Sequence, residues 1–165
     1  MRARLLTLAL MLVTALAVAQ QPAKQAKQPP ANKTYVSASD VTAMMAKAKN
    51  ERKQDQANFS QALLQLAPYS ANMEYRSAVP QAAAVHEKEA EMFFVIDGSG
   101  TLVTGGKLVG ETRNGDNLTG TAIEGGDTQA VAKGDFFIVP ENTPHWFSKI
   151  NGTLVLMSLH VPRPR

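Results

Sequence analysis

From residue 58 onwards, the chain consists of short apolar runs separated by Gly, Pro and Asn, and none of them has the length or period of a helix. Runs of this kind are typical of strands. We count eight candidates and a strong final one, at 59–66, 72–79, 82–86, 91–97, 100–104, 119–124, 135–139, 145–150 and 153–161. Many strands without helices predict an all-β sandwich or barrel over 58–165.

One helix is expected before these strands, within 35–57. Ser37 and Asp40 have the spacing of a capping box, which satisfies the first free N–H groups of a helix. Apolar residues follow at helical spacing, namely Val41, Met44, Met45 and Ala48. This pattern predicts one short helix that packs against the outside of the main sheet.

The first nineteen residues have the features of a secretory signal peptide. Arg2 and Arg4 precede an apolar run over 5–18, and Ala17-Val18-Ala19 offers a small-residue cleavage site before Gln20. The run is too short to span a bilayer, which favours cleavage over the alternative of an uncleaved anchor. We therefore expect a periplasmic or secreted protein, in which 20–34, rich in Gln, Pro and Lys, is a flexible linker.

Composition narrows the classes of partner and chemistry. The chain has no cysteine, so neither a disulfide framework nor a thiol enzyme is possible. It has 17 basic and 14 acidic residues, and loss of 1–19 would remove two of the arginines. A nearly neutral domain without a basic stripe gives no reason to expect binding to nucleic acid or to an anionic membrane.

Two blocks carry residue types that ligate metals. His86 and Glu91 lead into an apolar run that ends at Gly98, and His145 follows a corner bracketed by Pro140 and Pro144. The blocks resemble the paired motifs of the cupin superfamily, G-x5-H-x-H-x3 or 4-E-x6-G and G-x5-P-x-G-x2-H-x3-N. The matching positions are His86, Glu91, Gly98, Gly134, Pro140 and His145, and the departures are Ala78, Ala84, Asn142 and Lys149.

The resemblance implies a jelly-roll barrel that binds a divalent metal ion, Fe, Mn, Zn or Ni, through His86, Glu91 and His145. It also implies a pocket for a small organic ligand, for which we name Phe93, Val95, Phe137 and Phe147 as inward-facing residues.

The spacing of the residues is compatible with such a site. Ala84 and His86 share one face of a strand, and a turn over 87–90 would let Glu91 open the next strand beside His86. Asn142 suits a left-handed corner where the family has glycine. Ala84 replaces the first motif histidine, so a fourth ligand would have to be water, Glu89 or His160.

A structural role is the favoured interpretation for His160, which shares a strand face with Leu154, Leu156 and Ser158. The leading hypothesis is an exported metal-binding cupin that acts on a small organic molecule, with metal-assisted oxygenation or isomerisation as the reaction if it is an enzyme. The alternative is a non-catalytic binding module with a degenerate metal site. A homodimer formed through 154–161 or the N-terminal segment is a further expectation.

Overall fold

The computed structural model describes residues 32–163, which form one helix and eleven strands. The elements are α1 (Ala38–Glu51), β1 (Asn58–Leu66), β2 (Tyr69–Ser77), β3 (Ala83–His86), β4 (Glu89–Thr104), β5 (Lys107–Val109), β6 (Thr112–Asn114), β7 (Asn117–Gly120), β8 (Ala122–Glu124), β9 (Asp127–Ala132), β10 (Phe136–Val139) and β11 (His145–Pro162). The expected signal peptide and most of the expected linker lie outside the described residues. Within the described part of the chain, no helix is long and apolar enough to cross a membrane.

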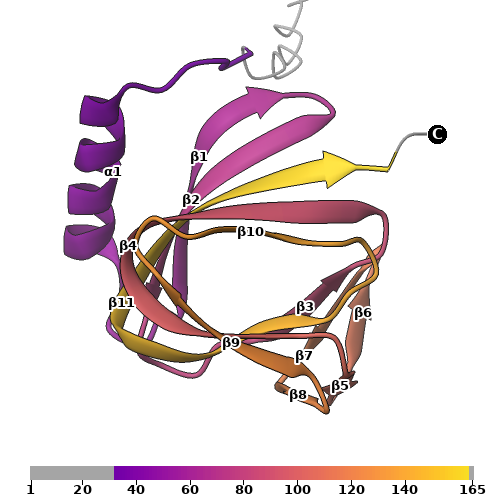
Figure 1. Ribbon diagram of the computed structural model, residues 1–165. Coiled ribbons are helices and arrows are strands. Elements are labelled where there is room, and N and C mark those ends of the chain that lie inside the picture. Colours follow the sequence, from indigo (N-terminus) through magenta and orange to yellow (C-terminus); the bar gives the residue numbers. More distant parts are fainter. Residues whose placement is uncertain (1–31, 164–165) are drawn as a thin grey trace, which may run out of the picture.

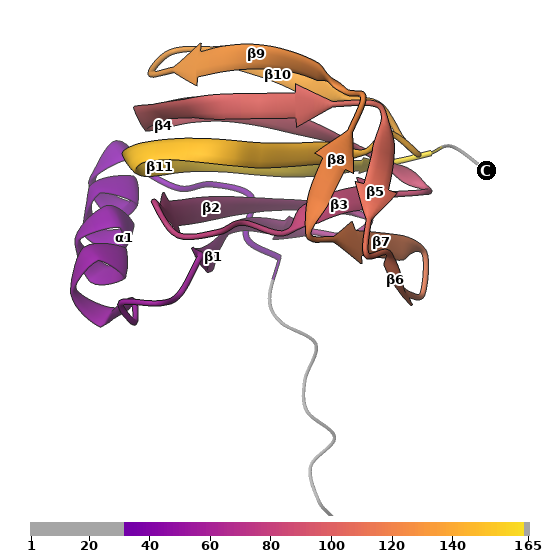
Figure 2. The ribbon, with the colours of Figure 1, turned by 90° about the horizontal axis from the view of Figure 1, so that it is seen from below.

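The strands form an antiparallel barrel (Figure 1). Nine of them make one sheet in the order β1-β2-β11-β3-β7-β6, with β4 along β11 and both β9 and β10 paired with β4. The short β5–β8 pair forms a second sheet that lies across one end of the barrel (Figure 2). The all-β jelly-roll class predicted from the sequence is therefore confirmed.

Two long strands replace four of the predicted short ones. β4 joins 91–97 to 100–104, and β11 joins 145–150 to 153–161. Gly98, between 91–97 and 100–104, bends β4 but does not end it. It has φ +84°, and a Cβ at this position would lie 2.0 Å from the carbonyl oxygen of Thr153. Glycine inside a strand often marks such a close approach of two backbones.

The segment between the two sequence blocks is more ordered than its composition indicates. Within 105–126 the sequence predicted one strand, at 119–124, but the segment contains β5, β6, β7 and β8. β9 was also missed, because only Val131 of its six residues is buried and the strand has no apolar alternation. Short, exposed strands are held by backbone pairing, which leaves little trace in side-chain pattern.

The predicted helix is confirmed as α1. Ser37 Oγ accepts the N–H of Asp40 at 3.1 Å, and the Ser37 N–H donates to the Asp40 carboxylate at 3.0 Å, so both halves of the capping box are present. The helix lies against the outside of the barrel (Figure 1). Its apolar side chains pack in one cluster with Leu63, Ala71, Met73 and Val155.

Alternation along the strands divides each of them into an outer and an inner face. On β11, Val155 and Met157 belong to the cluster beneath the helix, whereas Leu154 and Leu156 are buried in the barrel interior. The interior core consists of Phe93, Val95, Leu102, Val131, Val139, Phe147, Ile150, Leu154 and Leu156. Ser158 and His160 continue the inner face of β11, so the last strand carries polar groups into the barrel.

Candidate metal centre

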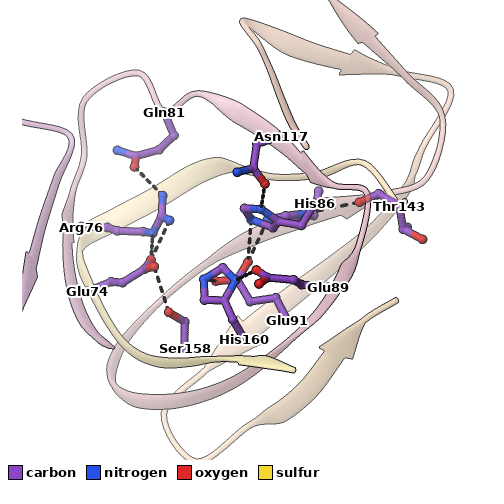
Figure 3. A network of polar contacts seen from close by, with 11 residues as sticks. Glu74, Arg76, Gln81, His86, Glu89, Glu91, Asn117, Thr143, Ser158 and His160 are labelled. Carbon is purple, nitrogen blue, oxygen red and sulfur yellow. Dashed lines mark hydrogen bonds and ion pairs between the residues drawn. The ribbon is translucent and has the colours of Figure 1, made fainter. Parts of the chain in front are cut away.

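All three histidines of the chain converge on one buried carboxylate, that of Glu91. The Nε2 atom of His86 lies 3.3 Å and that of His145 3.2 Å from Glu91 Oε2, and the Nε2 atom of His160 lies 3.3 Å from Oε1. Only 4% of Glu91 is exposed to solvent. Figure 3 shows His86, His160 and Glu91 pointing toward one another from different strands.

Strand register explains this convergence. His160 and Glu91 are direct partners across β11 and β4, and His145 is the partner of Ala84, which shares a face of β3 with His86. The turn after β3 is shorter than predicted, because β4 begins at Glu89 and not at Glu91, but Glu91 still lies beside His86 as expected. The second motif corner is fixed by Asn142, which has φ +55° and donates its N–H to the His86 carbonyl at 2.7 Å.

The second ring nitrogen of each histidine faces a hydrogen-bond acceptor. The Nδ1 atom of His86 lies 2.7 Å from Asn117 Oδ1, that of His145 lies 3.4 Å from the Thr143 carbonyl, and that of His160 lies 3.0 Å from a Glu89 oxygen. A backbone carbonyl or a carboxylate can only accept, so Nδ1 carries the proton in His145 and His160, and His86 has the same tautomer when Asn117 presents its Oδ1. The three Nε2 atoms are then left with lone pairs aimed at Glu91, unless a proton or a cation lies between them.

The pKa values of Glu91, His86 and His160 indicate that the cluster favours positive charge beside the Glu91 carboxylate. Burial raises the pKa of Glu91, but hydrogen bonds from the three histidines outweigh burial and hold this pKa far below the usual 4.5. For His86, burial lowers the pKa, and the bonds to Glu91 and Asn117 more than compensate, so the pKa is raised. The bond to Glu91 likewise raises the pKa of His160. A divalent cation bound at the Nε2 atoms would neutralise the Glu91 carboxylate in place of protons on these nitrogens.

The three residues expected to ligate the metal, His86, Glu91 and His145, are brought together. His160 joins them, although a structural role was the favoured interpretation for it. The ligand atoms of His86, Glu91 and His160 all lie within 4.8 Å of one another, and His145 contacts the same carboxylate. The sequence placed His160 on the inner face of the last strand, but its pairing with Glu91 depends on the β4–β11 register, which the sequence does not specify.

The residues named for a ligand pocket form the apolar wall beside this cluster. Phe93, Val95 and Phe147 are buried in the barrel core, and Phe137 is partly buried against them. The ring of Phe93 stacks on Phe137 with centroids 5.0 Å apart and lies 6.1 Å from the ring of His145. Phe147 also lines a cavity of about 360 Å³ at the surface, together with Gln81 and Trp146.

A second polar network, which was not predicted from the sequence, crosses the barrel interior (Figure 3). Arg76 donates from Nε to Glu74 at 2.7 Å, and Ser158, which is fully buried, donates to the same carboxylate at 3.0 Å. Arg76 also reaches Gln81 at 3.2 Å and lies 4.9 Å above the ring of Phe147. Burying an ion pair carries a large desolvation cost, which these additional bonds reduce.

Comparison with known proteins gives structural similarity only. No family model matches the sequence, and no curated protein matches it. BH2720 from Bacillus halodurans is similar in structure, with 15% identity, a TM-score of 0.51 and coverage of 84% of this chain and 86% of that one.

Two further solved structures are similar. KdgF from Halomonas sp. has 14% identity and a TM-score of 0.49, with coverage of 68% of this chain and 87% of that one. The cupin domain of Cnp3 from Schizosaccharomyces pombe has 14% identity and a TM-score of 0.45, with coverage of 67% of this chain and 65% of that one. The likeness to BH2720, at 15% identity, concerns the fold and not the activity. With its two motif blocks folded onto one antiparallel barrel, the chain has the cupin fold.

Proposed function

We propose that this protein is a metal-binding cupin, which holds one divalent transition-metal ion between the Glu91 carboxylate and the Nε2 atoms of His86, His145 and His160. The observation that carries the proposal is the orientation of the three imidazoles. Each has its Nδ1 beside an acceptor, which is the arrangement that fixes metal-ligating histidines, and each aims its Nε2 at one carboxylate.

Three imidazoles and one carboxylate suit the borderline ions Fe, Mn, Zn and Ni, rather than the oxygen-loving Ca²⁺ or Mg²⁺. Such an ion would supply Lewis acidity to a bound substrate. His160 takes the place of the fourth ligand that Ala84 cannot provide. Phe93 and its aromatic neighbours exclude water from the side of the cluster that faces the barrel core.

We propose a small organic molecule as the substrate, with metal-assisted oxygenation or isomerisation as the reaction. The edge of the cluster meets solvent, since the His86 and His160 side chains are 19% and 18% exposed. The hydrogen bonds to Nδ1 would hold these rings in place around the ion, which would polarise a bound substrate.

A second candidate, a non-catalytic protein with a structural or relic metal site, is favoured by the packing beneath the cluster. Phe93, Val95 and Phe147 are 1%, 0% and 2% exposed, so the residues expected to line a pocket fill the core instead. Metal-dependent turnover of a substrate library by the exported protein, absent after chelation and after Glu91→Gln, would distinguish an enzyme from this alternative.

Metal binding itself is tested by elemental analysis of protein purified without a histidine tag, because a tag would add competing imidazoles. We expect about one equivalent of a single divalent metal, and about one equivalent on reloading chelator-stripped protein with Mn, Fe, Ni or Zn. Protein that carries no metal and binds none of these ions at micromolar concentration would refute the proposal.

Export is also part of the proposal, on the basis of the basic, apolar and small-residue regions within residues 1–19. The absence of cysteine is compatible with an oxidising compartment, since no thiol is present to be oxidised.

A further inference from the structure

The hairpin of β6 and β7 contributes a residue to the cluster although it carries none of the four proposed ligands. We infer that Asn117, the first residue of β7, is a positioning residue that fixes the tautomer and orientation of His86 for metal binding. The inference rests on the proposed function, since it concerns affinity for the ion held there. Nothing in the two sequence motifs points to Asn117, which lies in the segment between them.

Strand pairing brings the two side chains together. His86 and Asn117 are direct partners across β3 and β7, so their side chains project from the same face of the sheet. The distance between His86 Nδ1 and Asn117 Oδ1 is 2.7 Å, the shortest of the three contacts at a histidine Nδ1. Figure 3 shows Asn117 on the side of His86 that faces away from Glu91.

The direction of this hydrogen bond determines whether His86 can ligate. If Asn117 accepts through Oδ1, the proton sits on Nδ1 and the Nε2 lone pair faces Glu91 and the ion. If the amide were turned and donated through Nδ2, the proton would sit on Nε2, where it would block a metal. The structure places Oδ1, the acceptor atom of the amide, 2.7 Å from His86 Nδ1, which favours acceptance and gives His86 the same Nδ1-protonated form as the acceptors Thr143 and Glu89 favour in the other two rings.

The hairpin is tied to the residues that follow His86. The guanidinium of Arg113 donates to both oxygens of Glu87, at 2.7 and 2.9 Å, and the Glu87 N–H donates to the Asp116 carbonyl at 3.0 Å. Lys88 forms an ion pair with the Asp116 carboxylate at 2.8 Å. Bidentate pairs constrain geometry more than single ones, so these contacts hold Asn117 in register with His86.

Three variants of the full-length, chelator-stripped protein test the role of Asn117. Asn117→Leu has a similar volume but cannot accept a hydrogen bond, whereas Asn117→Asp can accept and cannot donate. Asn114→Ala, at an exposed position of the same hairpin, is the matched control. Affinities for Zn²⁺ and Co²⁺ are measured by calorimetry, and the Co²⁺ absorption spectrum reports the ligand field at the ion.

We expect Asn117→Leu to weaken the affinity for Zn²⁺ and Co²⁺ about tenfold. This is the lower end of the range for residues that hydrogen-bond to a metal ligand, because Asn117 is exposed to solvent. Asn117→Asp should bind at least as tightly as the wild type, with the wild-type Co²⁺ spectrum, and Asn114→Ala should match the wild type. If Asn117→Leu does not fold, Asn117→Ala removes the same acceptor without the larger side chain.

The outcomes separate this inference from the proposed function. A wild type that binds neither ion refutes the metal site itself. A wild type that binds, together with an Asn117→Leu variant of unchanged affinity and spectrum, refutes only the role of Asn117. Equal losses for the Leu and Asp variants would show that Asn117 donates to His86, and that would also overturn the inference.

Discussion

Replacing His160 with alanine tests the ligand that the sequence motifs do not include. In the absence of metal the change should be mild, because Glu91 keeps its contacts with His86 and His145 and only the hydrogen bonds of one partly exposed imidazole are lost. Such bonds contribute about 1–2 kcal/mol. In the presence of metal the loss should be much larger.

The size of that loss follows from the number of ligands. Four-ligand zinc sites contribute about 10–16 kcal/mol, or about 2.5–4 kcal/mol for each ligand, so loss of one ligand should weaken the affinity by about 10² to 10³. At a fixed excess of free metal, the stabilisation on binding should fall by about 2.7–4.1 kcal/mol. For a domain of this size, such a difference lowers the melting temperature of the metal-loaded form by about 10 °C.

The assay is thermal unfolding of the wild type and the variant, each with excess chelator and with a fixed excess of Zn²⁺ or Mn²⁺. Ser70→Ala is the control for loss of a polar side chain at the same place in the sheet, since Ser70 is the direct partner of His160 across β2 and β11 and carries no metal-ligating group of the proposed set. A His160→Ala variant that keeps the metal-dependent rise in melting temperature would show that His160 does not ligate. The site would then be the three-ligand set of His86, Glu91 and His145.

Four further predictions follow from described features. Ala84→His, introduced into the His160→Ala variant, should raise its metal affinity at least tenfold, since position 84 faces His145 and shares a strand face with His86. Calorimetry measures this affinity, and no recovery would show that a side chain at position 84 cannot reach the ion. In chelator, the raised pKa values of His86 and His160 mean that their stabilisation is present below pH 6.5 and lost as the pH rises through their folded-state values. In urea unfolding, the free energy of unfolding of the metal-free protein should therefore fall as the pH rises above 6.5. With excess metal it should rise over the same pH range, because metal competes with protons for the histidines. Parallel pH profiles with and without metal would contradict this. Gly98→Ala should lower the free energy of unfolding by about 3 kcal/mol or more, because the added Cβ meets a backbone carbonyl at 2.0 Å, and a near-neutral effect would refute that contact. N-terminal sequencing of the exported protein should begin at Gln20 or within a residue or two, whereas intact Met1 in cytoplasmic protein would count against export.

The parts of the fold that the sequence predicted are those governed by local rules. The capping box at Ser37 and the left-handed corner at Asn142 depend only on neighbouring residues, and both were predicted correctly. The motif spacing also brought His86, Glu91 and His145 into one cluster.

The parts that were missed depend on pairing between distant strands. His160 meets Glu91 only because β11 pairs with β4 in one particular register, and Asn117 meets His86 only because a hairpin from the intervening segment pairs with β3. Local pattern gives the face on which a residue lies but not its partner across the sheet. The buried pair of Glu74 and Arg76 was missed for the same reason, since charged residues are expected at the surface until a partner is known.

The two histidines at opposite ends of β11 have a consequence for the folding reaction. His145 and His160 are fifteen residues apart on one strand, a length of about 50 Å if it were straight, yet both rings touch the same carboxylate. The strand can do this only by curling around the barrel, with irregularities near Phe147, Ile150 and Val155. Closure of the barrel and assembly of the site thus occur together. Both require contacts between residues that are far apart in the sequence, and such contacts form slowly compared with a local helix. A refolding chain should therefore acquire metal affinity last, so the rate of metal uptake in a stopped-flow experiment would time the closure of the barrel.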